Sequence, residues 1–272
     1  MRFIGDYHIH TPFCPHGSSD DWEQYILKAI ALGLEELSFT EHAPLPRSFI
    51  DPVPEQDSAM NWRDLPTYLK LGNELKIKYQ DQIKINIGFE VDYIEGYEQE
   101  TKQFLDLYGD QIDDSILSVH MLKIAEGQYG CLDFSPEVFS SIVEAFGSVE
   151  SVYHQYYQTL KMAIEANLGY YKPTRIGHLT LIEKFSKKFP VQINQLNPID
   201  QLLDLIKEKN YALDLNTAGL YKPDCQSIYP NQQVTNKAKE MGIPLIPGSD
   251  SHESATIARG FSHIKDYITY SD

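Results

Sequence analysis

Short apolar runs alternate with amphipathic stretches along most of the chain. The short runs predict strands over residues 3–10, 36–40, 83–90, 115–120, 175–178, 212–217 and 243–250. The amphipathic stretches have helical spacing and predict helices over residues 21–33, 65–79, 97–108, 149–167, 199–209 and 233–241. Residues 43–62 are rich in proline and serine and predict a long surface loop, and residues 121–147 are expected to be irregular.

The order of these elements predicts the fold class. Strands that alternate with helices at this spacing form right-handed crossovers and a parallel sheet. About seven such units in one domain over residues 1–272 favour a closed α/β barrel. A doubly wound open sheet is the alternative.

Composition and charge narrow the possible partners. The chain has 272 residues, 42% of them hydrophobic and 23% charged, which is typical of a globular protein. Its 23 basic and 39 acidic residues give a net charge of −16, so binding to nucleic acid or to a membrane surface is not expected. The first residues lack the apolar stretch of a secretory signal. Three widely spaced cysteines imply no disulfide framework and favour the cytoplasm.

Polar residues gather at the ends of the predicted strands. Seven of the nine histidines lie there (His8, His10, His16, His42, His120, His178 and His252), together with Glu90, Asn216 and Asp250. In a β/α barrel the carboxyl ends of the strands form one rim, so these side chains should converge. One such histidine would usually be an ordinary hydrogen-bonded residue. Seven histidines and two carboxylates that are buried together without a metal would leave several polar groups unsatisfied. Imidazole and carboxylate ligands suit Zn, Mn or Fe, so the sequence predicts a metal site.

The motifs around these residues resemble those of a known family. They are, in chain order, His8-Ile9-His10-Thr11, Thr40-Glu41-His42, Gly88-Phe89-Glu90, Ser118-Val119-His120, Ile176-Gly177-His178 and Gly248-Ser249-Asp250-Ser251-His252. This set resembles the PHP (polymerase and histidinol phosphatase) superfamily. The stretches 10–17, 40–46, 90–94 and 114–120 are similar to its histidinol-phosphatase branch. The resemblance implies a distorted seven-stranded (β/α)7 TIM-like barrel, the PHP fold, with three divalent metal ions.

The resemblance also implies a ligand set. His8, His10, Glu90 and Asp250 would hold one ion, and Glu90 would bridge to a second ion held by His120 and His178. His16, His42 and His252 would hold the third ion, with Asp20 as an alternative to His16. Zn, Fe and Mn all remain open as the metals. Cys14 could also ligate metal, but it is interpreted as a packed thiol.

The activity that the resemblance implies is hydrolysis of L-histidinol phosphate to L-histidinol and phosphate, a step of histidine biosynthesis. A hydroxide that bridges two metals would be the nucleophile. Glu90, Asp250 and His252 are the expected catalytic residues, and either Asp250 or His252 could pass a proton to the leaving group.

Substrate contacts are predicted from position alone. Arg47 and Arg175 are favoured over Arg259 as phosphate-binding residues, with a surface ion pair as the alternative for each. Asp92 and Asn216 are expected to contact the histidinol end.

The sequence leaves three alternatives to this function. A PHP-type phosphoesterase could act on nucleotides or other small phosphomonoesters. An amidohydrolase-type barrel also begins with His-x-His, but its ligand set fits less well. A non-catalytic PHP module would be expected to lose ligands, whereas this chain keeps every expected type.

Overall fold

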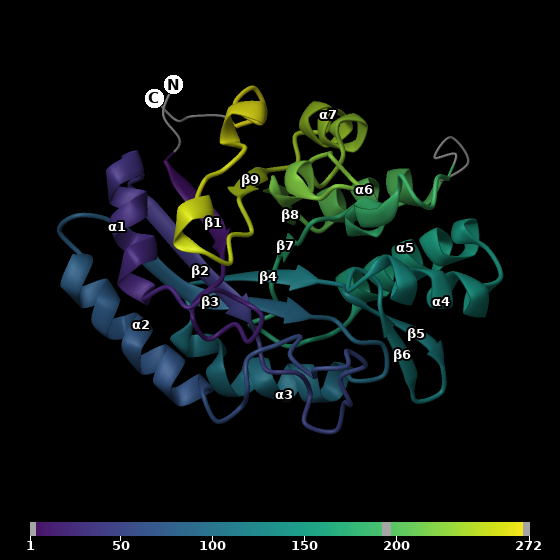
Figure 1. Ribbon diagram of the computed structural model, residues 1–272, viewed down its shortest axis with the longest axis horizontal. Helices are drawn as coiled ribbons and strands as arrows, with labels where there is room; N and C mark the ends of the chain where they lie inside the picture. The colour runs from purple at the N-terminus through teal and green to yellow at the C-terminus, as the bar shows by residue number, and fades with distance from the viewer. Residues whose placement is uncertain (1–3, 192–196, 269–272) are drawn as a thin grey trace.

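Seven parallel strands form the wall of a barrel in the computed structural model, which describes residues 4–191 and 197–268 (Figure 1). In their order around the barrel they are β1 (Gly5–Ile9), β2 (Glu36–His42), β3 (Lys84–Asp92), β4 (Asp114–Ser118), β7 (Arg175–Ile176), β8 (Ala212–Asn216) and β9 (Leu245–Gly248). The predicted seven-stranded α/β barrel is therefore confirmed. Phe3, the predicted start of the first strand, and the ends of the predicted single domain lie outside the described residues.

The barrel closes where β9 meets β1. Ile9 forms a parallel bridge with Ser251, and the amide of His10 donates to the Ser251 carbonyl at 2.9 Å. The amide of Asp250 donates to the His8 carbonyl at 2.8 Å. The barrel is distorted on the other side, because β7 is only two residues long. A doubly wound open sheet is thus excluded.

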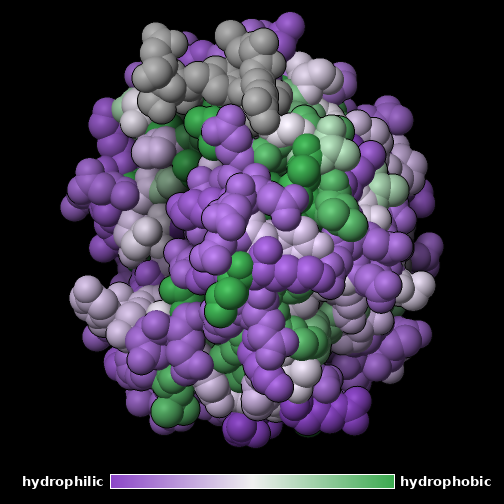
Figure 2. Space-filling model, turned by 90° about the vertical axis from the view of Figure 1, so that its left-hand side faces the viewer, coloured by the Kyte–Doolittle hydropathy of each residue, from purple (hydrophilic) through white to green (hydrophobic). Residues whose placement is uncertain are grey.

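Helices surround the strands (Figure 1). They are α1 (Trp22–Leu32), α2 (Leu65–Tyr79), α3 (Glu98–Tyr108), α4 (Pro136–Phe146), α5 (Val149–Glu165), α6 (Asn197–Glu208) and α7 (Gln232–Glu240). In α1, Tyr25, Ile26 and Ala29 are buried, as the helical spacing predicts. The face that carries α1 and α2 is mostly hydrophilic, with apolar side chains in separate small areas (Figure 2). No helix in the described part of the chain has both the length and the apolar character needed to cross a membrane.

The prediction of an irregular segment over residues 121–147 is wrong. It contains an antiparallel hairpin, β5 (Met121–Ala125) and β6 (Gln128–Cys131), followed by α4. The hairpin forms its own two-stranded sheet. It therefore lies outside the repeating order of strand and helix from which the barrel was predicted. The start of α4 did carry a signal, because the Ser135 side chain caps the Val138 amide and Pro136 follows Ser135.

The predicted loop over residues 43–62 has no helix or strand. Ala43 and Met60 belong to the main hydrophobic core, and Trp62 packs against it. The Trp62 indole donates to the Leu45 carbonyl at 2.8 Å, and the Ser58 hydroxyl donates to Asp51 at 2.9 Å. Asp57 reaches the carboxyl end of the barrel, where its carbonyl accepts from His16 Nδ1 at 2.8 Å. The loop is therefore fixed at several points, including one histidine of the rim.

Gly248 marks the closest approach of β9 to its neighbours. A Cβ atom there would lie 2.5 Å from His8 Cβ and 2.5 Å from Asp214 Oδ1. No side chain fits at this distance, so the glycine allows the β1, β8 and β9 side chains to meet inside the barrel.

Arg175, at the start of β7, is predicted to stabilise the amino-terminal end of the barrel. Its Nη2 donates to the Tyr7 carbonyl and to Asp114 Oδ2, both at 2.9 Å. Removing a buried guanidinium leaves both acceptors without this partner. Arg175→Ala should therefore lower the free energy of unfolding by about 2–4 kcal/mol in urea denaturation. Lys84→Ala is the control, because its pair with Glu36 is largely exposed on the lysine side and its loss should cost under about 0.5 kcal/mol. Equal stability of the two variants would contradict the assignment.

Candidate metal centre

Glu90 of β3 lies at the centre of the histidines that the strand ends bring together. It is only 2% exposed. Its Oε2 is 3.4 Å from His8 Nε2 and 3.2 Å from His42 Nδ1, and its Oε1 is 2.8 Å from His178 Nε2. His10 and His120 also face this carboxylate, at 3.6 and 3.8 Å. One buried carboxylate thus contacts imidazoles from several strand ends.

Two groups around Glu90 have the spacing of metal ligands. His8, His10 and Glu90 form one, and Glu90, His120 and His178 form the other, with ligand atoms within 4.8 Å of each other. Asp250 adds a carboxylate to the first group, because its Oδ1 is 3.1 Å from His10 Nε2. Asp250 has a positive φ of 55°, a strained backbone conformation of the kind found at functional sites.

A third group lies beside the first. His10, Cys14, His42 and His252 place one ligand atom each within the same 4.8 Å limit. The ring of His16 lies at the exposed rim, 5.2 Å from the ring of His42 and 5.1 Å from that of His252. The structure therefore brings together all nine residues that the sequence predicts as ligands.

The hydrogen bonds of His8 show that a cation fits this centre. Its Nδ1 lies 2.8 Å from Asp214 Oδ2, and this carboxylate accepts the Nδ1 proton. In the neutral ring, Nε2 then carries a lone pair. That atom is buried and has no hydrogen-bond partner, although two carboxylates, Glu90 and Asp250, lie near it. A lone pair and two carboxylates in a dry interior are unfavourable together unless a positive charge lies between them.

The pKa values of the histidines indicate the same need for positive charge. Burial alone would lower the pKa of His8, but the Asp214, Glu90 and Asp250 carboxylates raise it well above its usual value. Burial also opposes protonation of His120, but Asp92 and Glu90 raise its pKa to about 10. Metal binding to imidazole displaces protons, so bound cations would supply the charge that these carboxylates favour.

Further carboxylates orient the candidate ligands from behind. Asp92 Oδ1 lies 2.7 Å from His120 Nδ1. Glu41 Oε1 lies 3.3 Å from His10 Nδ1 and accepts from the His42 amide at 2.9 Å. Such partners select the tautomer of a ligating histidine and hold its ring in place.

The candidate ligands open into a cavity of about 550 Å³ at the carboxyl ends of the strands. Glu90, Asp250 and His252 line it, and so do His16, His42, His120 and His178. Within the described part of the chain, its basic lining residues apart from histidine are Lys184, Lys222 and Arg259. Lys184 Nζ donates to Asp133 Oδ2 at 2.9 Å. The cavity thus combines metal-ligand groups with separate cationic side chains.

Comparison with known families identifies this arrangement. The family model described as "PHP domain" matches residues 6–218. The chain belongs to the PHP domain family. The match includes every predicted ligand of the PHP centre except Asp250 and His252, which follow it along the chain.

Individual proteins similar to this PHP protein include several histidinol phosphatases. The histidinol-phosphatase of Bacillus subtilis is 45% identical over 94% of this chain and 96% of its own length. A crystal structure of a candidate histidinol phosphatase from Listeria monocytogenes is 42% identical, with a TM-score of 0.91 over 95% of this chain and 99% of that one. The histidinol phosphate phosphatase of Lactococcus lactis was crystallised with zinc, L-histidinol and phosphate. At 22% identity, a TM-score of 0.69 and coverage of 99% and 95%, it shows the shared fold.

Arg175 does not lie in the PHP cavity, so its predicted role as a phosphate ligand is wrong. It lines a separate cavity with Gly5 and Glu36 at the amino-terminal end of the barrel, opposite the candidate metal ligands. The reason is its place at the start of β7, whereas His178 follows the end of that strand.

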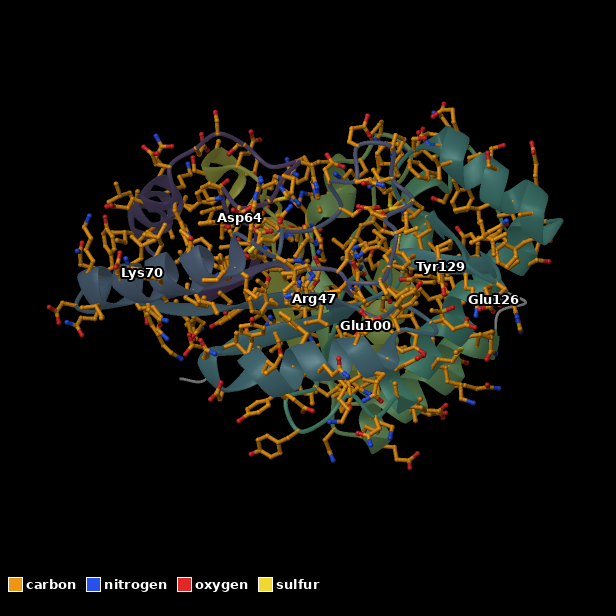
Figure 3. The ribbon with its side chains drawn as sticks, turned by 90° about the horizontal axis from the view of Figure 1, so that it is seen from below. Arg47, Asp64, Lys70, Glu100, Glu126 and Tyr129 are labelled. Atoms are coloured by element: carbon orange, nitrogen blue, oxygen red, sulfur yellow. The ribbon has the colours of Figure 1, made fainter. Side chains whose placement is uncertain are left out.

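Arg47 also lies outside the PHP cavity. Its guanidinium stacks 3.9 Å above the Trp62 ring and lines a small cavity against α3. Figure 3 shows Arg47 beside this helix, with Glu100 nearby. The sequence placed Arg47 correctly in the loop but could not show towards which side the loop turns it.

Asp92 and Asn216 contact candidate ligands. Asp92 lines the cavity, but its carboxylate holds His120. Asn216 is fully buried and donates to Asp250 Oδ2 at 3.2 Å, so its predicted contact with a substrate is wrong. Asp20, the alternative to His16, accepts from the amide and hydroxyl of Ser254.

Asp214 contacts a candidate metal ligand, and the sequence prediction missed it. It is fully buried on β8. Its Oδ2 contacts His8 Nδ1 and accepts from the side-chain amide of Asn216. A signal existed, because Asp214 and Asn216 are two residues apart on one strand and therefore point to the same face.

Asp214→Asn is predicted to weaken metal binding by about 10–100-fold, because the amide no longer selects the His8 tautomer with a free Nε2. Zinc affinity measured by competition with a chelating dye checks this. Asp106→Asn is the matched control, since Asp106 pairs with Lys102 on the surface. Unchanged affinity in Asp214→Asn would contradict the proposed role of the His8–Asp214 contact.

Proposed function

We propose that this protein hydrolyses L-histidinol phosphate to L-histidinol and phosphate with the help of divalent metal ions. The similarity to the Bacillus subtilis histidinol-phosphatase, 45% over nearly the whole chain, carries this proposal. The nine candidate ligands also support it, because a metal-dependent phosphatase needs side chains of this kind around one cavity.

The proposed metal ligands follow from the geometry of the centre. His8, His10, Glu90 and Asp250 would hold one ion, and Glu90 would share the second with His120 and His178. His16, His42 and His252 would hold the third. When bound, divalent ions such as Zn, Fe or Mn would neutralise phosphoryl oxygens and supply a water molecule of lowered pKa as the nucleophile.

The basic residues of the cavity are the proposed phosphate contacts. A phosphate monoester carries about two negative charges near neutral pH. Burial and the nearby Lys184 cation lower the pKa of Lys222, so an anion close to Lys222 would be favourable. The Arg259 guanidinium lies 4.5 Å above the Tyr221 ring, which holds this planar group at the cavity.

Other lining residues suit the remainder of the substrate. Asp57 and Glu253 offer carboxylates for its ammonium group and imidazole ring, and Phe134 offers an apolar surface. Asp250 and His252 both line the cavity, so either can pass a proton to the leaving alkoxide. Glu90, Asp250 and His252 are the proposed catalytic residues. The three cysteines are free thiols, which supports the cytoplasm as the proposed location.

Phosphate release from L-histidinol phosphate is the first test. The metal-loaded protein should release phosphate, and the metal-stripped protein should not until Zn or Mn is returned. Glu90→Gln should lower kcat by at least about 100-fold, because the amide is a poor shared ligand for two cations. Glu95→Gln is the control, since Glu95 faces Lys123 outside the cavity.

Nucleoside monophosphates and other small phosphomonoesters form the comparison panel. A kcat/KM that is highest for L-histidinol phosphate supports the proposal. Faster hydrolysis of a nucleotide by the same metal-loaded protein would replace the substrate and keep the metal centre. Full activity of the Glu90→Gln variant would contradict the shared-ligand role.

Lys222→Ala and Arg259→Ala are each predicted to raise KM for L-histidinol phosphate by about 10-fold or more, because each removes a charge-assisted contact to phosphate. Arg47→Ala should leave KM within about twofold, because Arg47 lines a different cavity. Steady-state kinetics of the three variants check this. A larger effect in Arg47→Ala than in both of the others would overturn the assignment of the phosphate contacts.

A further inference from the structure

Cys14 lies among the candidate metal ligands and differs from the other two cysteines. Its side chain is buried, with 4% exposed, and its sulfur falls within 4.8 Å of ligand atoms of His10, His42 and His252. The Cys131 thiol donates to Asp133 Oδ1, and the Cys225 thiol contacts the Ser227 carbonyl. The His16 amide donates a hydrogen bond to the Cys14 sulfur, so this sulfur acts as an acceptor. The Cys14 sulfur is thus buried next to three imidazoles, in a position where it can offer a lone pair to a cation that they share.

A tight turn holds Cys14 in this place. The Cys14 amide donates to the Thr11 carbonyl, and the Gly17 amide donates to the Cys14 carbonyl, both at 3.0 Å. A Cβ atom on Gly17 would lie 3.2 Å from Cys14 Cβ, so a side chain at residue 17 would press on Cys14. The turn begins directly after His10 and carries His16, so it connects two proposed ligands through Cys14.

His10 faces the first metal position, because its Nε2 is 3.1 Å from Asp250 Oδ1. The other histidines of the group, His42 and His252, belong to the third position, where the His16 ring also lies. The Cys14 sulfur is then a candidate extra donor for the third position.

We propose that Cys14 Sγ is a ligand of the metal ion held by His42 and His252, so that this position has a mixed nitrogen and sulfur ligand set. This inference rests on the metal centre proposed above. Coordination replaces the S–H bond by a metal–sulfur bond, and the proton passes to solvent. Sulfur ligands favour Zn²⁺, Co²⁺ and Fe²⁺ over Mn²⁺, so Cys14 would bias this position against Mn²⁺.

Cobalt substitution tests the ligand without recourse to activity. The full-length protein is stripped of metal, loaded with Co²⁺, and analysed for bound cobalt and for the near-ultraviolet charge-transfer absorption of a thiolate–Co²⁺ bond. We expect this absorption in the unaltered protein and in Cys225→Ser, and its loss in Cys14→Ser. Cys14→Ser should also lower Zn²⁺ affinity at this position by about tenfold or more, with a change in Mn²⁺ affinity of under about threefold.

A double variant keeps the test decisive if Cys14→Ser does not fold. In Cys131→Ser/Cys225→Ser, Cys14 is the one remaining thiol of the chain, so the absorption must persist. Protein that binds Co²⁺ without this absorption overturns the role of Cys14 and leaves the metal centre intact. Protein that binds no Co²⁺, Zn²⁺ or Mn²⁺ overturns the metal centre, and the role of Cys14 with it.

Discussion

A buried carboxylate that faces five imidazole rings is the constraint on which the rest of this structure depends. Glu90 contacts His8 and His10 from the first strand, His42 from the second, and His120 and His178 beyond two further strands. Burying these groups costs free energy unless positive charge and fixed hydrogen bonds compensate. Asp214 and Asp92 supply fixed partners to His8 and His120. The carboxyl end of the barrel interior is therefore polar and suited to holding cations, beside the apolar core that the strands share with the helices.

The closure of the barrel serves the same requirement. Asp6 of β1 is fully buried and accepts from the amide and hydroxyl of Ser249 and from the Ala258 amide. Burial raises the pKa of Asp6 to about 6, although these hydrogen bonds partly offset the effect. The contact fixes the segment after β9 against β1. Asp250 and His252 consequently reach His10, although some 240 residues separate them along the chain. Without this closure the first group would lack its second carboxylate.

The sequence could predict the strand ends and the residues on them, because both follow from local patterns. Apolar runs locate the strands, and parallel strands place their carboxyl ends on one rim, so the convergence of the histidines with Glu90 was predictable. The position of Arg175 shows the limit of this reasoning. Arg175 lies three residues before His178, so the chain order alone places it nearer the amino-terminal end of the barrel. The sequence does not show which residues it contacts there, because Tyr7 and Asp114 belong to other strands. The hairpin over 121–131 was missed because it pairs outside the barrel.

Most proposed metal ligands lie on barrel strands or within two residues of a strand end, whereas the proposed phosphate contacts lie farther along the connecting segments. Ligands such as His8 and Glu90 are fixed by strands that pair on both sides, so a small change in any of them disturbs the barrel. Lys184 lies in a short helical segment that follows β7. Lys222, Asp57 and Arg259 lie in connecting segments. Connecting segments tolerate substitution and insertion better than barrel strands do. The cationic part of the cavity can therefore change without loss of the proposed metal centre, and it would place positive charge beside the phosphate of the proposed substrate in a chain whose net charge is −16. For the proposed reaction, the choice of phosphomonoester would then depend mainly on the connecting segments, and the capacity to hydrolyse it mainly on the strands and their carboxyl ends.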